Sequence, residues 1–183
     1  MKFTAQDEYG LRCILQLARY ELGATAKSDG ATAELIPCLT IAEIASQEGL
    51  TPQYAGRFVT VLVKAGIVES VRGRKGGVRL SRRPEKISIL EVLRALGGDL
   101  YQESTCDRYT GDRAFCVHTN DCSIRSLWAG LQLMINDVLS RTTLMDLCSS
   151  ESTVSQWMKG HEEAYNNFHP IQSYGVTVRG DNA

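Results

Sequence analysis

The sequence predicts a mainly α fold with one small β-hairpin: a winged helix-turn-helix followed by a long dimerisation helix. Two observations predict it. Residues 40–83 read as two capped helices and a glycine-rich hairpin, and residues 124–141 read as a helix with a wide apolar stripe. Apolar residues make up 43% of the 183 residues, which is enough for a core. No apolar run approaches the roughly 20 residues needed to span a bilayer.

The first helix is predicted over residues 4–22, where apolar side chains recur at three- and four-residue spacing. Cys13 extends this apolar face and is expected in the core. Residues 23–37 are small and polar, and they are expected to form a flexible loop that ends near Cys38.

A helix pair follows the loop. Thr40 and Glu43 form a capping box for a helix over residues 41–47, which Gly49 ends. Thr51 and Pro52 then open a second helix that runs to about residue 65. Its apolar stripe consists of Ala55, Phe58, Val59 and Leu62. The opposite face offers amide, hydroxyl and guanidinium groups, as the recognition helix of a DNA-binding protein requires.

Charge also indicates DNA binding. The whole chain has a net charge of −1, but residues 40–83 hold eight Lys or Arg and three acids, a net +5. Such a patch attracts phosphates, whereas a solvated charged hairpin is the alternative. For Tyr54, the alternative to a DNA contact is packing against the preceding helix. The predicted DNA contacts on the helix and the hairpin are Thr51, Gln53, Tyr54, Arg57, Thr60, Lys64, Arg72, Arg74, Lys75 and Arg79.

The rest of the chain contains shorter elements around one long helix. A helix is expected over residues 88–96, no periodicity is seen over 100–122, and short helices are expected over 143–148 and 153–164. The predicted organisation is a winged helix-turn-helix domain (1–98), a cysteine loop (99–123), a dimerisation helix with terminal helices (124–165) and a flexible tail (166–183). So small a domain cannot bury the whole stripe of the long helix. A homodimer is therefore predicted, with packing of that helix on its own domain as the alternative.

The cysteine loop predicts a metal or redox site. Cys106, Cys116 and Cys122 are spaced C-x9-C-x5-C, and thiolates are the ligands that iron–sulfur clusters prefer. His118, a carboxylate elsewhere or a small molecule would be the fourth ligand. Zinc, a thiol switch or three unrelated cysteines are the alternatives. The first eight residues carry acids where a signal peptide needs an apolar stretch, so a cytoplasmic protein with reduced thiols and no membrane association is expected.

Several segments resemble the Rrf-two family of bacterial transcription regulators. They are residues 1–4, 8–12 and 64–73, the Gly76-Gly77 pair with Leu80, and the cysteine loop, which resembles the iron–sulfur branch of IscR, NsrR and RirA types. The resemblance covers about residues 1–145. It implies a regulator that binds a palindromic operator in double-stranded DNA as a homodimer. The long helices would cross, and the cluster would lie between the loop and the other subunit's N-terminal helix. An iron–sulfur redox enzyme or thiol oxidoreductase is a further alternative, but the sequence has no CxxC pair and no dinucleotide-binding glycine motif, so no enzyme is expected.

The resemblance also implies a ligand set. The three loop cysteines, Cys106, Cys116 and Cys122, would bind a 2Fe–2S or 4Fe–4S cluster, and Glu8 would be the fourth ligand, as in the nitric-oxide-sensing type. His118 is the alternative, because the position of the histidine ligand of the IscR type is Arg125 here. The cluster would sense nitric oxide, redox or iron status. A regulator of the same fold controlled by thiols or a protein partner is the alternative function.

Overall fold

The computed structural model describes residues 4–27, 38–73, 76–99, 101 and 105–168 of the chain. The chain divides into two units, Met1–Ser149 and Ser150–Ala183. Within the described ranges, none of the helices combines the length and apolar character that a bilayer crossing requires.

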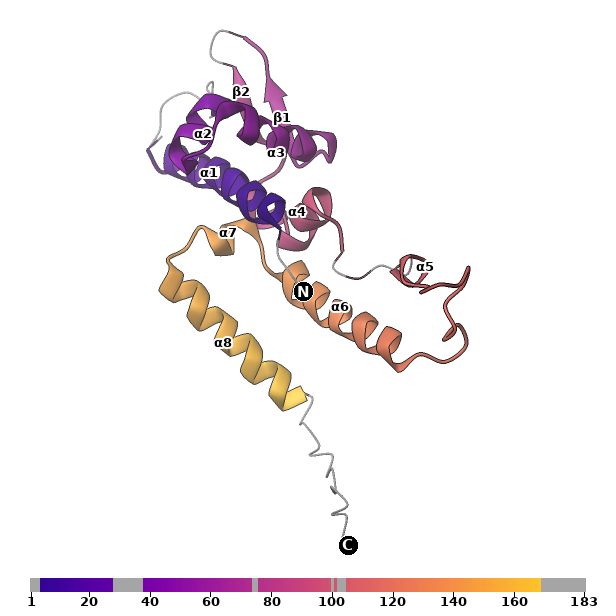
Figure 1. The fold of residues 1–183 in the computed structure, drawn as a ribbon. Coiled ribbons are helices and arrows are strands. Elements are labelled where there is room, and N and C mark those ends of the chain that lie inside the picture. Colours follow the sequence, from indigo (N-terminus) through magenta and orange to yellow (C-terminus); the bar gives the residue numbers. More distant parts are fainter. Residues whose placement is uncertain (1–3, 28–37, 74–75, 100, 102–104, 169–183) are drawn as a thin grey trace, which may run out of the picture. The chain divides into compact units, whose positions relative to one another are not determined.

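The predicted fold class is confirmed, since the first unit is mainly helical with a two-stranded hairpin (Figure 1). In order, its elements are α1 (Ala5–Lys27), α2 (Ile41–Glu48), α3 (Pro52–Lys64), β1 (Val68–Val71), β2 (Gly77–Leu80), the 3-10 turn η1 (Pro84–Lys86), α4 (Ile89–Leu96), α5 (Thr105–Arg108), α6 (Ser123–Arg141) and α7 (Leu144–Leu147). The second unit contains α8 (Glu151–Phe168).

The predicted caps of the helix pair are present. The Thr40 side chain accepts a hydrogen bond from Glu43 N, and the Glu43 carboxylate accepts one from Thr40 N at 2.7 Å. These hydrogen bonds from Thr40 lower the pKa of Glu43. Gly49 ends α2 at a φ of 66°, a left-handed conformation that favours glycine. Thr51 then caps α3 with Pro52 at its first position, so local sequence fixes both helix starts.

The hairpin is antiparallel, with Val68 opposite Leu80 and Val71 opposite Gly77. Leu39, just before α2, also pairs with β2. Leu39 N donates to Val78 O at 3.0 Å, and Val78 N donates to Leu39 O at 2.8 Å. A Cβ at Gly77 would lie 2.4 Å from Leu39 O. Only glycine allows this close pairing, which ties the hairpin to the start of the helix pair.

The core lies between α1, α3, α4 and the hairpin. Cys13 is fully buried there, as predicted, and burial raises the pKa of its thiol to about 11. Leu144 of α7 is also fully buried. Ile89 N donates to Thr142 O at 2.8 Å, and Leu144 N donates to Ile87 O at 3.0 Å. The chain thus returns to the core of the winged domain after the long helix.

Two expected helix boundaries are wrong, and the cysteine loop contains a helical turn that the sequence did not predict. Helix α1 continues to Lys27, through residues assigned to the loop, because alanine and lysine after Gly23 favour a helix. The cysteine loop contains the single turn α5, which is too short to show periodicity in sequence. Helix α8 runs from Glu151 to Phe168, well beyond residues 153–164 and into the predicted tail. The rest of the expected loop (28–37) and tail (169–183) lies outside the described residues.

Candidate functional site

Helix α3 has one buried and one exposed face. The predicted stripe lies in the core, with Ala55, Phe58, Val59 and Leu62 at most 4% exposed. The opposite face exposes Gln53, Arg57, Thr60 and Lys64. Arg57 and Lys64 form no ion pair with any residue of the described ranges. The helix therefore presents an amide, a hydroxyl and two uncompensated cations to solvent, which suits contacts with base edges and phosphates.

Two other predicted DNA contacts also hold α3 in place. Thr51 is exposed, and its hydroxyl oxygen accepts a hydrogen bond from Tyr54 N at 3.2 Å. The half-buried Tyr54 ring packs edge-to-face on Phe58 and on Tyr9 of α1, with centroid distances of 4.7 and 5.7 Å. Tyr54 thus joins α3 to α1, and a contact of its hydroxyl with DNA stays a prediction.

A buried carboxylate joins α1 to the end of α2. The Glu48 side chain is 7% exposed and accepts a hydrogen bond from Arg12 Nε at 2.6 Å and another from Gln16. Arg12 Nη2 also donates to Glu48 O at 3.1 Å. The hydrogen bond to Glu48 raises the pKa of Arg12, so the guanidinium stays charged. Because Glu48 directly precedes the turn at Gly49, α1 fixes the connection that leads into α3. The sequence patterns gave no sign of this contact.

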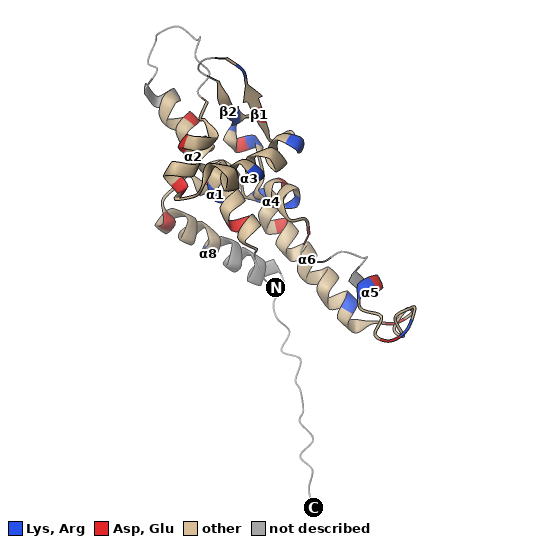
Figure 2. Cartoon of the chain, turned by 45° about the horizontal axis from the view of Figure 1, so that its top comes forward, with Lys and Arg blue, Asp and Glu red and all other residues tan. Residues whose placement is uncertain are grey.

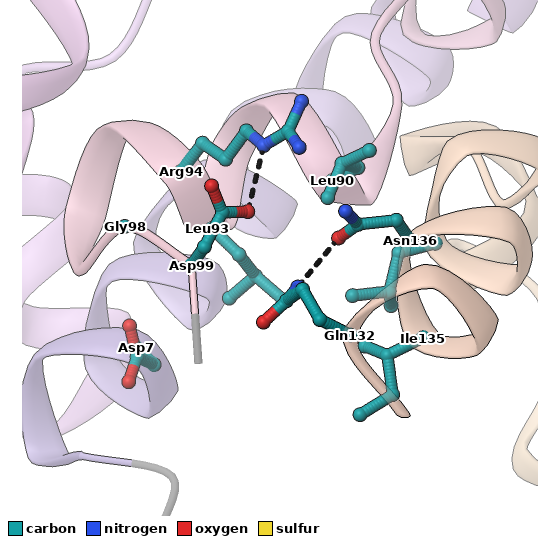
Figure 3. Close-up of a pocket in the computed structure, with 10 residues that line it drawn as sticks. Asp7, Leu90, Leu93, Arg94, Gly98, Asp99, Gln132, Ile135 and Asn136 are labelled. Carbon is teal, nitrogen blue, oxygen red and sulfur yellow. Dashed lines mark hydrogen bonds and ion pairs between the residues drawn. The ribbon is translucent and has the colours of Figure 1, made fainter. Parts of the chain in front are cut away.

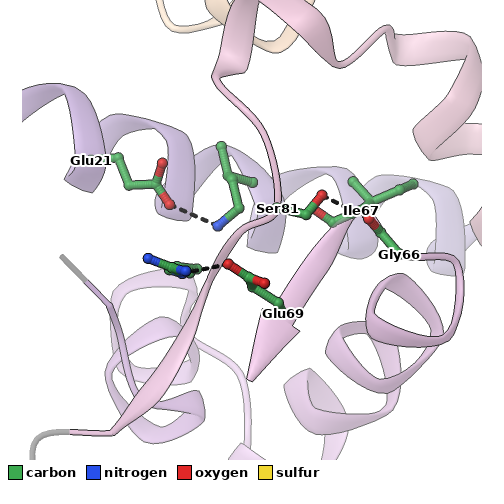
Figure 4. A network of polar contacts seen from close by, with 7 residues as sticks. Glu21, Gly66, Ile67, Glu69 and Ser81 are labelled. Carbon is green, nitrogen blue, oxygen red and sulfur yellow. Dashed lines mark hydrogen bonds and ion pairs between the residues drawn. The ribbon is translucent and has the colours of Figure 1, made fainter. Parts of the chain in front are cut away.

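Polar contacts hold the base of the hairpin to α1, to the turn after α3 and across its own two strands (Figure 4). Glu21 Oε1 of α1 accepts a hydrogen bond from Leu80 N at 2.7 Å, and the Ser81 hydroxyl donates to Gly66 O at 2.7 Å. Burial raises the pKa of Glu21. Arg79 Nε lies 2.5 Å from Glu69 Oε1, so this predicted DNA contact is already paired within the hairpin.

Basic residues lie on α3, on the hairpin and on the segment after it, as well as on other elements such as α5 and α6 (Figure 2). The charged residues of α2 are all acids, and α1 carries both signs of charge. Arg72 is exposed and forms no ion pair with a described residue. Arg82 and Arg83 pair with Glu91 and Glu85. Arg74 and Lys75, predicted at the hairpin tip, lie outside the described residues.

Two open hollows flank the exposed face of α3. One, of about 490 Å³, lies between α3, Ile41 at the start of α2 and Gln6 of α1. The other, of about 530 Å³, lies at the turn formed by residues 49–51. Gln53 and Arg57 line both hollows, and none of the described lining residues is an acid. This surface can receive a polyanion without like-charge repulsion.

The three loop cysteines line one open pocket. Cys106 on α5, Cys116 in the loop and Cys122 at the start of α6 surround a volume of about 720 Å³, together with His118 and Arg125. Cys122 is the N-cap residue of α6, and its Sγ accepts a hydrogen bond from Arg125 N at 3.4 Å. Arg125 Nη2 donates to Thr119 O at 3.0 Å and so holds the loop against the helix.

The donor set of this pocket has the chemistry of an iron–sulfur site, but the donors do not converge on one point. Among the described residues, no group of three or more His, Cys, Asp or Glu side chains is close enough to hold a metal ion. The three thiols are half-buried. Glu8 is exposed on α1 and does not line the pocket, whereas His118 does. The structure thus gathers the predicted cysteines and His118 around one space and leaves Glu8 outside it.

A much smaller cavity lies between Asp7 of α1, helix α4 and helix α6 (Figure 3). Arg94 Nε pairs with Asp99 Oδ1 at 2.9 Å along its wall, and Gln132 Nε2 donates to Asn136 Oδ1 at 2.7 Å. The cavity measures about 30 Å³, which is room for on the order of one or two water molecules. It is too small to be a ligand site.

The sequence is similar to known transcriptional regulators. A model of the Rrf2 family, described as an iron-dependent transcriptional regulator, matches residues 3–150. The HTH-type transcriptional regulator NsrR of Bacillus licheniformis is 29% identical over 154 residues, which are 84% of this chain and 96% of the relative.

Solved structures are similar over most of their length. T. potens IscR has a TM-score of 0.57 and 27% identity, with 90% of each chain covered. The oxidised form of Staphylococcus aureus CymR has a TM-score of 0.56 and 29% identity, with 82% of this chain and 98% of that chain covered.

Proposed function

Because the chain belongs to the Rrf2 family of transcription regulators, we propose that it binds a palindromic DNA operator as a homodimer with an affinity set by an iron–sulfur cluster. The observation that carries this proposal is the common pocket of Cys106, Cys116 and Cys122. The sequence resemblance to the family is confirmed, and with it the expectation of a regulator that is not an enzyme.

The proposed DNA contacts are those predicted from the sequence: Thr51, Gln53, Tyr54, Arg57, Thr60, Lys64, Arg72, Arg74, Lys75 and Arg79. Support comes from the exposed, uncompensated Arg57 and Lys64 on α3 and from Arg72 on the hairpin. A two-fold dimer would present two copies of α3 to the two half-sites of a palindrome. A cytoplasmic location, where the thiols would stay reduced, belongs to the same proposal.

In the proposed ligand set, Cys106, Cys116 and Cys122 hold the cluster and Glu8 of the partner subunit completes it. Glu8 is exposed on α1, so its carboxylate is available to a second copy. His118 is the second candidate, and its place in the cysteine pocket supports it. The cysteines carry the main share of binding because thiolate is the ligand that iron–sulfur chemistry prefers.

When bound, a cluster of 2Fe–2S or 4Fe–4S type supplies iron that responds to nitric oxide, to oxidation or to iron supply. A carboxylate is a harder ligand than thiolate, so Glu8 would be the ligand most readily released. Glu8 lies one turn before Arg12, which holds Glu48 at the end of α2. Release of Glu8 would therefore free a helix that positions the recognition helix, and operator affinity would change with it.

Serine variants of the cysteines test this proposal. Cys106→Ser, Cys116→Ser and Cys122→Ser should each abolish or severely reduce iron and sulfide in protein purified without oxygen. Cys38→Ser and Cys148→Ser, outside the pocket, should leave both unchanged. Glu8→Ala should keep the cluster but shift its visible spectrum and speed its loss in air. Full iron content in Cys106→Ser would overturn the ligand assignment.

A second candidate function is a regulator of the same fold controlled by thiol oxidation. Two observations favour it: the similar CymR structure is of an oxidised form, and the donors of the cysteine pocket do not converge. A colourless protein that binds its operator only when reduced would identify this function. Visible absorption bands from anaerobically purified protein would identify the first.

A further inference from the structure

Gly56 lies inside α3, on the side that carries the exposed polar residues. Among the described residues, a Cβ built on it would meet only Ile41 within 4 Å, at 3.7 Å from Cγ2 and 3.9 Å from Cδ1, which is ordinary van der Waals contact. Its φ is not positive, unlike that of Gly49 or Gly66. Neither the packing nor the backbone conformation of this protein therefore requires glycine at position 56.

Other glycines of the domain show what such a requirement looks like. A Cβ at Gly10 would lie 2.5 Å from the Leu96 side chain, and a Cβ at Gly77 would lie 2.4 Å from Leu39 O. Glycine in a helix interior is among the least favourable residues, because it loses the most backbone freedom on folding. The described part of the chain therefore gives no reason for glycine at position 56, and a binding partner would give one.

The surroundings of Gly56 indicate what lies there. Gly56 lines the hollow of about 490 Å³ between α3 and the start of α2, with Gln53, Arg57 and Thr60 around it. The lining residues that the structure describes include one cation and no acid, so the hollow complements a phosphate strand. The Thr60 hydroxyl donates to Gly56 O at 2.7 Å. This bond holds the Thr60 hydroxyl against the backbone of α3 beside Gly56.

We propose that Gly56 is a close-approach point, where one sugar–phosphate strand of double-stranded DNA lies against the backbone of α3 with no room for a side chain. Arg57 and Gln53 would then contact the DNA on either side of the approach. The absence of a Cβ sets how deeply α3 enters the groove, which makes Gly56 a determinant of DNA affinity.

The proposal predicts opposite effects of one substitution on folding and on binding. Gly56→Ala should raise the midpoint of thermal unfolding by roughly 2–4 °C, because alanine is the better helix former and its Cβ fits beside Ile41. The same variant should bind DNA at least 10-fold more weakly. The probe is a duplex that the wild-type protein selects from a random-sequence pool, titrated at fixed salt and protein concentration.

Gly23→Ala is the matched control, since Gly23 is an exposed glycine inside α1 and no described residue lies within 4 Å of a built Cβ. It should gain similar thermal stability and keep wild-type DNA affinity. Gly56→Ser, which also adds a Cβ, should weaken binding as Gly56→Ala does. Binding of Gly56→Ala within two-fold of wild type would overturn the proposal, as would a fall in its unfolding midpoint. Failure of the wild-type protein to select any duplex would instead overturn DNA binding itself.

Discussion

Glu21 and Glu48 are carboxylates at junctions between elements. Glu48 is held by Arg12 and Gln16 where α1 meets the end of α2, and Glu21 accepts the Leu80 N–H where α1 meets the hairpin. Buried carboxylates need such partners, because an unpaired charge is costly away from water. Through these two residues, α1 positions both parts of the proposed DNA-binding surface.

Glu21 should make folding stability depend on pH. Burial raises its pKa in the folded protein above the ordinary value of 4.5. Its stabilising contribution is therefore fully present below pH 4.5 and is lost as pH rises through the raised pKa. Glu21→Gln keeps an oxygen acceptor for Leu80 N but does not titrate. The free energy of unfolding of Glu21→Gln minus that of wild type should therefore increase from about pH 4 to about pH 7. Urea titration at fixed protein concentration measures this difference. A difference that falls over this range would contradict the burial argument.

At the scale of elements, α3 and the hairpin present different chemistry. Helix α3 exposes Gln53 and Arg57 beside two hollows, which suits readout of base edges. The hairpin exposes Arg72 near its tip and pairs Arg79 internally, which suits contacts with phosphates.

Substitutions on the two elements should separate specificity from general affinity. Arg57→Ala and Gln53→Ala should each weaken operator binding by roughly 1–3 kcal/mol and affect random DNA less. Arg72→Ala should weaken binding to all DNA and reduce the slope of log affinity against log salt by about one unit. Titrations at several salt concentrations measure both effects. Equal losses on operator and random DNA for the α3 variants would contradict their assignment to base readout.

At the scale of the whole molecule, α6 has an apolar face that the first unit does not cover. Ile124, Leu127, Trp128 and Leu131 are between 37% and 61% exposed, whereas Leu139 near the helix end packs on the core. A contiguous apolar surface of this kind marks an interaction site, and a second copy of α6 is the proposed partner.

Leu131→Asp should break this proposed homodimer, because it places a carboxylate in the apolar face where burial without a partner is unfavourable. Sedimentation should show a monomer or aggregate in place of the dimer. Leu133→Asp is the matched control, since Leu133 is 70% exposed and lies about 200° around the helix from Leu131. It should remain dimeric. Wild-type protein that sediments as a monomer at micromolar concentration would exclude this interface.

Local sequence was enough for the features that depend on neighbouring residues. The capping box at Thr40, the cap at Thr51, the turn at Gly49 and the buried stripe of α3 are all confirmed. The end of α1 was missed because no residue after Gly23 gives a strong stop signal, and a single glycine is tolerated within a helix.

The sequence by itself determined the fold class, the family and the residues that carry the proposed chemistry, because caps, periodicity and motif spacing act over a few residues. Only the tertiary structure decided which distant groups meet. It joined Arg12 to Glu48 and Glu21 to Leu80, placed His118 with the three loop cysteines and left Glu8 exposed. It also showed that no contact with a described residue requires glycine at position 56. Such contacts depend on how whole helices pack, and no local pattern in the chain encodes that packing.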